Sequence, residues 1–173
     1  DKNVLLDTLH KELIQSVARG TGPEKIISTL HKKLGSQNTR YQIKRLVMTE
    51  SAFFSASAQK DAFSELDVER YEIIATLDHK TSSICQSMDG KVFKMTDFEP
   101  GVTANPFHPF CRTTTAPYFE DDYSERIARD LDGETYYVPS NMKYEEWYEN
   151  QVGTHGKKKI DARRMIQANE TLD

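Results

Sequence analysis

The chain has 173 residues and a formal charge of −4, a length that fits one domain of ordinary size with extensions. This acidic balance argues against free nucleic-acid binding as the main activity, because duplex-binding proteins carry a basic face. Hydrophobic residues make up 37% of the chain and its mean hydropathy is −0.68, which predicts an elongated architecture with helical arms rather than a compact globule.

No apolar stretch approaches the roughly 18–20 residues that span a membrane. The opening residues 1–3 do not begin a signal peptide, so we expect synthesis in the cytoplasm. A first residue other than Met indicates a fragment or a processed product. Two cysteines are too few for a disulfide framework.

The first third of the chain predicts helices. Apolar residues within 4–17 and 26–34 recur every three or four positions, as on one face of a helix. A third, long helix is predicted from Thr39 to about Leu66, because that stretch contains neither Gly nor Pro. The residues expected to end or cap these helices are Gly20, Gly22, Pro23, Gly35, Ser36 and Asn38.

The middle of the chain predicts a small sheet. Residues 71–77 are rich in β-branched and aromatic side chains and predict a strand. Asp89-Gly90 is a turn signal before a second strand at 91–95, and residues 113–118 predict a third strand. Between them, residues 100–109 form a loop with three prolines.

The last third predicts short helices and a polar end. Residues 123–130 follow two aspartates and predict a short helix. A further helix, capped by Ser140 or Asn141, holds Trp147 as a packing anchor with its neighbouring tyrosines. The stretch 153–173 is polar and predicts a solvated terminal helix.

The strongest candidate for chemistry is a set of cysteine and histidine side chains between residues 78 and 112. Cys85 and the pair His108-x-x-Cys111 match the reach of tetrahedral zinc ligation, with His79, Asp78 or water as the fourth ligand. The same residues are also consistent with plain core packing, with a disulfide between the two cysteines, or with a thiolate nucleophile beside a histidine. Spacing alone does not separate these alternatives.

Charged residues outside that set have structural and functional interpretations. Asp78 and Asp89 could form a general acid–base pair, although the predicted turn at Asp89-Gly90 also accounts for Asp89. Arg45 and Glu50 lie on the long helix, either in a surface ion pair or with the arginine buried against a loop carbonyl or Asp78. The histidines expected to be solvated are His10, His31 and His155.

Three motifs follow one another in a specific order over about residues 38–119. They are Arg45-x-x-x-Thr49-Glu50, then Leu77-Asp78-x-x-Thr81-x-x-x-Cys85-x-x-x-Asp89-Gly90, then Asn105-Pro106-x-His108-Pro109-x-Cys111-Arg112-x-Thr114. This order resembles the phage head-morphogenesis family, the Mu F-like minor capsid proteins, and in particular those of tailed phages and prophages of Gram-positive bacteria.

The sequence departs from the family pattern at two positions. Ser82 and Thr113 stand where the family often has cysteines. The resemblance therefore implies that zinc, the candidate cofactor, binds more weakly or not at all. It implies a site that pins a loop through Cys85, His108 and Cys111, with no catalytic residue. The structural residues expected around that site are Asp78, Arg112, Arg45 and Glu50.

The resemblance implies a minor head protein of the α+β class. We expect N-terminal helices and one long helix packed on a small antiparallel sheet with a long proline-containing loop. The expected divisions are a helical arm at 1–37, the head-morphogenesis domain at 38–120, and a C-terminal helical extension with a polar tail at 121–173.

The implied partners are the portal, other head proteins and packaged DNA, with no membrane. The implied location is the bacterial host cytoplasm during assembly and then the virion interior. The alternatives are an enzyme or toxin module, for example acting on a nucleotide, and a zinc-stabilised binding module. The enzyme's site would comprise Asp78, Thr81, His108 and Arg112.

Overall fold

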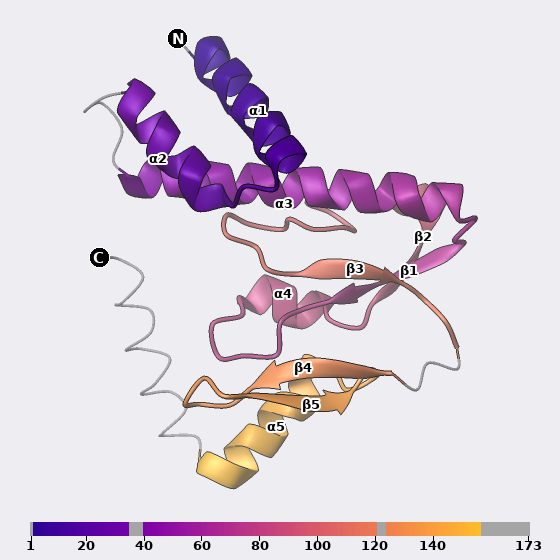
Figure 1. The fold of residues 1–173 in the computed structure, drawn as a ribbon. Helices are drawn as coiled ribbons and strands as arrows, with labels where there is room; N and C mark the ends of the chain where they lie inside the picture. The colour runs from indigo at the N-terminus through magenta and orange to yellow at the C-terminus, as the bar shows by residue number, and fades with distance from the viewer. Residues whose placement is uncertain (1, 35–39, 121–123, 157–173) are drawn as a thin grey trace.

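The computed structural model describes residues 2–34, 40–120 and 124–156. Three helices form the N-terminal layer: α1 (Lys2–Arg19), α2 (Pro23–Leu34) and α3 (Arg40–Glu65). Their bounds confirm the predicted helices. Gly20 follows α1 with a φ of 61°, a left-handed conformation that glycine adopts at no steric cost. Figure 1 shows α1 and α2 on one side of α3.

The apolar faces predicted from periodicity meet between these three helices. Leu9 of α1, Leu30 of α2 and Val47 of α3 are fully buried in one shared cluster. Burying one large aliphatic side chain contributes about 1.5–3 kcal/mol, so this cluster accounts for the association of the helices. The opposite side of α3 supplies Ala56 and Phe63 to a second cluster, which lies between this helix and the sheet described next.

The sheet is antiparallel with the strand order β2-β1-β3. Its strands are β1 (Arg70–Ile74), β2 (Val92–Lys94) and β3 (Thr114–Pro117). β2 and β3 lie within their predicted stretches, while β1 begins one residue before the predicted 71–77 and ends at Ile74. In the register, Tyr71 of β1 lies opposite Phe93 of β2, and Ile73 of β1 lies opposite Thr115 of β3. Alternate residues of β1 are buried, because they face the second cluster.

Two short helical segments flank β2. The six-residue helix α4 (Ser83–Met88) precedes it and was not predicted, while the 3-10 helix η2 (Met95–Asp97) follows it. The predicted turn at Asp89-Gly90 is present at the end of α4, where Gly90 has a φ of 69° and donates to the carbonyl of Ile73. The second predicted strand then follows as β2.

The last layer is a hairpin and a helix. Strands β4 (Glu125–Arg129) and β5 (Thr135–Pro139) pair antiparallel, and α5 (Tyr144–His155) packs on one face of them. Ala128, Val138 and Trp147 are buried in this layer together with Leu77, which also bridges to Ala128. The hairpin therefore shares a buried cluster with the segment that follows β1. Figure 1 shows the hairpin on the side of the first sheet that is away from α3.

Two expectations for this region were wrong. The predicted helix at 123–130 is the strand β4, because all five of its residues pair with β5 and Ala128 faces the core. The predicted helix around Trp147 is confirmed as α5, but the residue at its N-cap is Lys143, which makes no side-chain capping bond, and not Ser140 or Asn141.

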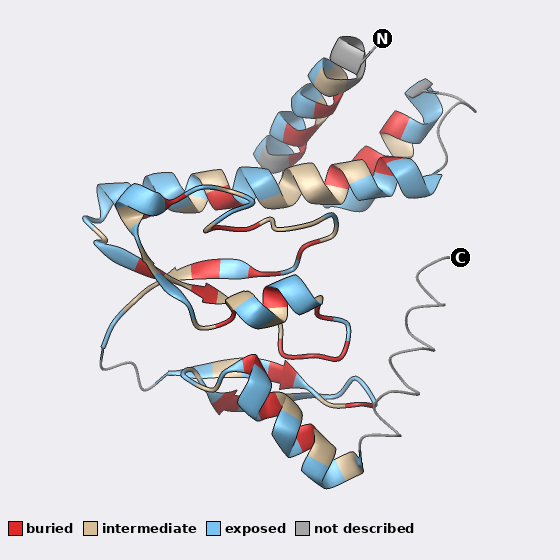
Figure 2. Cartoon of the chain, turned by 180° about the vertical axis from the view of Figure 1, so that it is seen from behind, coloured by how far each residue is buried: buried red, intermediate tan, exposed pale blue. Residues whose placement is uncertain are grey.

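The α+β class is confirmed, and the domain boundaries remain predictions. The expected positions at Gly35, Ser36, Asn38 and in the helix beyond residue 157 lie outside the described residues. None of the described helices is long and apolar enough to cross a membrane. Figure 2 shows buried positions in the loops beside α4 as well as in the strands. Leu77, Asp78 and His79, between β1 and α4, are buried. Such burial of irregular backbone marks the region of the candidate site.

Candidate functional site

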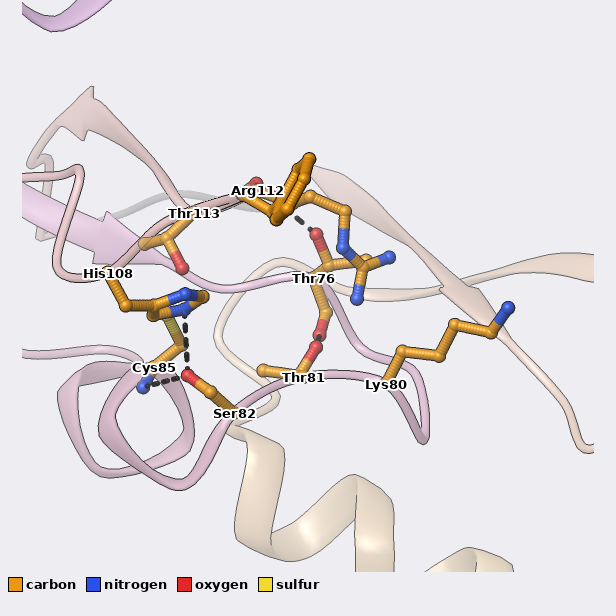
Figure 3. A pocket seen from close by; sticks show the side chains of 9 residues that line it. Thr76, Lys80, Thr81, Ser82, Cys85, His108, Arg112 and Thr113 are labelled. Atoms are coloured by element: carbon orange, nitrogen blue, oxygen red, sulfur yellow. Dashed lines mark hydrogen bonds between the residues drawn. The ribbon is translucent and has the colours of Figure 1, made fainter. Parts of the chain in front are cut away.

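The site forms where α4 meets the loop that leads into β3. Ser82 caps α4, since its Oγ accepts from the backbone amide of Cys85 at 3.3 Å, and this places Cys85 in the first turn. The loop brings His108 Nε2 to 3.1 Å from Cys85 Sγ, and Cys111 Sγ to 3.7 Å from the same sulfur. Figure 3 shows Ser82, Cys85 and His108 side by side.

A tight turn orients the imidazole. The amide of Cys111 donates to the carbonyl of His108 at 3.2 Å, and Phe110 between them has a φ of 59°, which is uncommon for a residue other than glycine. His108 Nδ1 lies 2.7 Å from the carbonyl oxygen of Pro109. Because a carbonyl only accepts, Nδ1 carries the hydrogen in the neutral ring, and the lone pair of Nε2 faces Cys85.

The hydrogen bond between the two thiols shifts their pKa values in opposite directions. Their hydrogen bond lowers the pKa of Cys111 against the opposing effect of burial, with help from the backbone amides of Phe107 and Thr113. The same hydrogen bond, followed by burial, raises the pKa of Cys85. Both cysteines are buried and neither is in a disulfide. Cys111 is therefore the thiol that loses its proton more readily, while Cys85 is the one that lies beside His108 Nε2.

Cys85, His108 and Cys111 offer three ligand atoms that all lie within 4.8 Å of one another. The 3.7 Å between the sulfurs is close to the edge of about 3.8 Å for a tetrahedron with zinc–sulfur bonds of about 2.3 Å. The donor types and their spacing thus fit a zinc ion with one position left for water. The hydroxyl of Ser82 lies 2.8 Å from His108 Nε2, but a serine is not one of the usual zinc ligands.

The other residues considered as a fourth ligand have different surroundings. His79 is buried with its ring against Trp147, at 4.9 Å between centroids. Asp78 is bound by Arg112 through two hydrogen bonds, Nη1–Oδ2 at 2.5 Å and Nη2–Oδ1 at 2.8 Å. Neither belongs to the three-donor cluster.

Asp78 joins a network that fixes the loop after β1. Its Oδ1 also accepts from the hydroxyl of Thr81 at 3.0 Å and from the amide of Lys80 at 2.9 Å. Burial raises the pKa of Asp78, but the hydrogen bonds and charge of Arg112, together with these two donors, outweigh it and leave the pKa below its ordinary value. The bonds to Asp78 raise the pKa of Arg112 in turn. The structure thus brings Asp78, Thr81 and Arg112 into contact, which are three of the four residues named for the enzyme alternative.

Arg45 and Glu50 are not brought to the site. Arg45 is exposed on α3, so the interpretation of a buried arginine that reaches Asp78 is wrong. Glu50 lies 4.0 Å from His10 of α1, across the helical layer. Of the histidines expected to be solvated, His10 and His31 are exposed and His155 is partly exposed.

The residue that sequence reasoning missed is Arg126. Its guanidinium pairs with Asp89, Nη2–Oδ1 at 3.0 Å, and also donates to the carbonyl of Ala75. Asp89 further accepts from the amides of Ala75 and Tyr144, each at 2.7 Å. The hypothesis of an acid–base pair of Asp78 and Asp89 is wrong, since each carboxylate is bound by a different arginine. No sequence signal marked Arg126, because its segment was predicted as helix.

A match to a family model shows that this chain is a phage head protein. The family described as "Phage Mu protein F like protein" matches residues 7–116, which are more than half of the chain. The chain therefore belongs to the Mu F-like family of head-morphogenesis proteins, a component of the virion, as its motifs predicted. The match begins in α1, earlier than the resemblance did, and ends in β3. No curated protein and no solved structure matches.

Proposed function

We propose that this chain is a minor capsid protein that takes part in head assembly near the portal through protein–protein contacts. The family match over residues 7–116 carries the proposal, because it covers the helical layer, the sheet and the cysteine–histidine site together. The corresponding location is the host cytoplasm during assembly and the virion interior afterwards, and the source is a phage or prophage of Gram-positive bacteria.

Exposed apolar side chains on the helical layer support a contact role. Phe53 and Phe54 on α3 are 45% and 40% exposed, and Ile14 on α1 is 63% exposed. Large apolar side chains that gather on an exposed helix pair are typical of protein interaction sites. The ring of Phe54 also contacts His10 of α1, so the two helices contribute to the same surface.

The cysteine–histidine site has a structural role in this proposal. Cys85, His108 and Cys111 hold the loop that precedes β3 against α4, and a zinc ion bound by these three residues would supply a stronger cross-link. The alternative of an enzyme or toxin site around Asp78, Thr81, His108 and Arg112 has less support. Both oxygens of Asp78 are occupied by donors from this same chain.

Co-purification with the portal protein tests the proposal. The chain is co-expressed with the portal protein of its own phage and isolated through a tag on the portal. We expect the wild-type chain to be retained. The double variant Phe53→Ser/Phe54→Ser should lose at least tenfold in retained chain. Leu66→Ser, which removes an apolar side chain that is 73% exposed near the end of α3, serves as the control. No retention of the wild-type chain would contradict the proposal.

A further inference from the structure

A cleft of about 360 Å³ lies between the first sheet and the β4–β5 hairpin. Its walls come from the end of β1, the start of β3 and the strand β4, and they include Thr76 and Thr114. Three arginines line it, namely Arg112, Arg126 and Arg129, and none of the described residues that line it is acidic. The cleft is separate from the cysteine–histidine cluster, whose three residues do not line it.

The arginines of the cleft differ in how many of their N–H groups remain available to a ligand. Arg126 is 10% exposed and donates to Asp89, to the carbonyl of Ala75 and to the carbonyl of Met142, so its charge and donors are used within the fold. The side chain of Arg112 is 41% exposed and gives two of its five N–H groups to Asp78. Three N–H groups of Arg112 remain, on a guanidinium that is already held in place.

Two further cations flank Arg112. Thr76 and Arg112 also line a smaller cavity, which Lys80 lines together with Cys85 and His108, so Arg112 belongs to the walls of both hollows. In Figure 3 the side chains of Arg112 and Lys80 extend to the same side, away from His108. Lys80 and Arg129 are both exposed, and within the described part of the chain neither side chain forms an ion pair or a hydrogen bond.

We propose that this cleft binds a phosphate group, with Arg112 as the fixed donor and Lys80 and Arg129 as the flanking charges. The planar fork of an arginine matches the geometry of phosphate oxygens, and a guanidinium held by a buried carboxylate loses little entropy on binding. The hydroxyls of Thr76 and Thr114 donate to the carbonyl of Arg112 and to Gln59, so the cations are the donors that remain for the ligand. The phosphate comes from a nucleic-acid backbone or from a small phosphorylated molecule.

The net charge of −4 is consistent with such a local site. A chain with an acidic balance has no general attraction for nucleic acid, so binding depends on these few cations and weakens steeply with salt. Each phosphate contact contributes a slope of about −0.7 in the logarithm of affinity against the logarithm of salt concentration for a single strand. The removal of two cations should therefore reduce the slope by about 1.4.

The test measures binding of a labelled single-stranded oligonucleotide to the full chain by fluorescence anisotropy at low salt. We expect saturable binding that Lys80→Ala/Arg129→Ala weakens at least tenfold. Lys94→Ala removes another exposed cation, from the edge strand β2, and should change the affinity less than twofold. Circular dichroism checks that the variants fold like the wild type.

Competition identifies the source of the phosphate. Displacement of the oligonucleotide by millimolar inorganic phosphate supports a site for a single phosphate group, and resistance to it, with binding still lost in the double variant, supports a nucleic-acid backbone. Absence of oligonucleotide and phosphate binding, an unaffected double variant, or equal binding of a poly-glutamate peptide would overturn the proposal. Failure of this test leaves the proposed portal association unaffected, because that association is tested with variants of a different surface, at Phe53 and Phe54.

Discussion

The carboxylate of Asp89 and the guanidinium of Arg126 form an ion pair at 3.0 Å in which the carboxylate side chain is fully buried. Asp89 lies within the residues that match the Mu F-like family, and Arg126 lies beyond them. The pair therefore joins the C-terminal hairpin to the family's common region. The amide of Tyr144 at the start of α5 donates to the same carboxylate. The side chain of Asp89 therefore links the hairpin and α5 to the family's common region.

Replacement of Asp89 by Asn should destabilise the fold strongly. The variant leaves the guanidinium of Arg126 buried without its counter-charge, and the loss of one partner of a buried pair costs about 3–5 kcal/mol. Urea unfolding measures this cost. Glu120→Gln is the control, because the pair of Arg70 with Glu120 is exposed on both sides and should be worth less than about 1 kcal/mol. Equal losses in the two variants would contradict the assigned role of Asp89.

The ion pair of Asp78 with Arg112 predicts a dependence of stability on acid. The pKa of Asp78 is lower in the folded protein than in the unfolded chain, where it is about 3.9. The folded state therefore binds its proton less readily, and the stabilisation is present above pH 4 and is lost as the pH falls toward the folded pKa. Between about pH 5 and pH 2.5, the free energy of unfolding should fall more steeply for the wild type than for Asp78→Asn.

Asp132→Asn is the control for that comparison, since Asp132 is exposed. Its profile should follow that of the wild type. If Asp78→Asn and the wild type lose stability in parallel over this range, the ion pair does not contribute as described.

Zinc binding is testable directly. Protein purified without chelator should contain about one zinc ion per chain, and chelator should lower its melting temperature. Cys85→Ser, His108→Ala and Cys111→Ser should each abolish the bound zinc, measured by elemental analysis. Less than stoichiometric zinc together with an unchanged melting temperature would exclude the metal role and leave the site as packed thiols or as a disulfide.

Ser82→Cys should strengthen zinc binding. The hydroxyl of Ser82 lies 2.8 Å from His108 Nε2 and 3.3 Å from the amide of Cys85, so a sulfur at this position falls beside the three donors. A third thiolate, as the fourth ligand, completes the tetrahedron that structural zinc sites prefer. We expect the affinity to rise at least tenfold in a competition assay with a chromophoric chelator. Ser87→Cys on the exposed side of α4 is the control and should leave the affinity unchanged.

Tyr136 holds the last layer together through its hydroxyl. That oxygen accepts from Trp147 Nε1 at 2.7 Å and from Gln151 Nε2 at 2.8 Å. Tyr136→Phe leaves both buried donors without this partner and should cost about 1–3 kcal/mol. Tyr137→Phe changes the neighbouring tyrosine, which is 67% exposed, and should cost almost nothing. Trp147 is the chain's single tryptophan, so its fluorescence follows the unfolding of this layer.

The helices and the first sheet were predictable because their patterns are local. Apolar spacing marks the face of α3 that buries Val47, and β-branched residues mark β1. The set of Cys85, His108 and Cys111 was predictable for another reason, since their residue types and the short His108–Cys111 spacing limit what they can form. Their approach to within 4.8 Å agrees with that prediction.

Two elements were not predictable from local pattern. The six residues of α4 are too few to show a helical period, and the helix depends on the cap from Ser82. The residues of β4 include several with good helix propensity, but they pair with β5 and bury Ala128 against Leu77. Tertiary packing overrides such weak local preferences.

The sequence by itself determined the elements with a clear period, the candidate ligands and the family. Only the tertiary structure decided which charges meet. Asp89 read as a turn residue and Arg126 as part of a helix, and 37 positions separate the two in the chain. They pair because the hairpin folds back over the end of β1, where a buried carboxylate requires a counter-charge. A pairing of that kind leaves no period or spacing in the sequence.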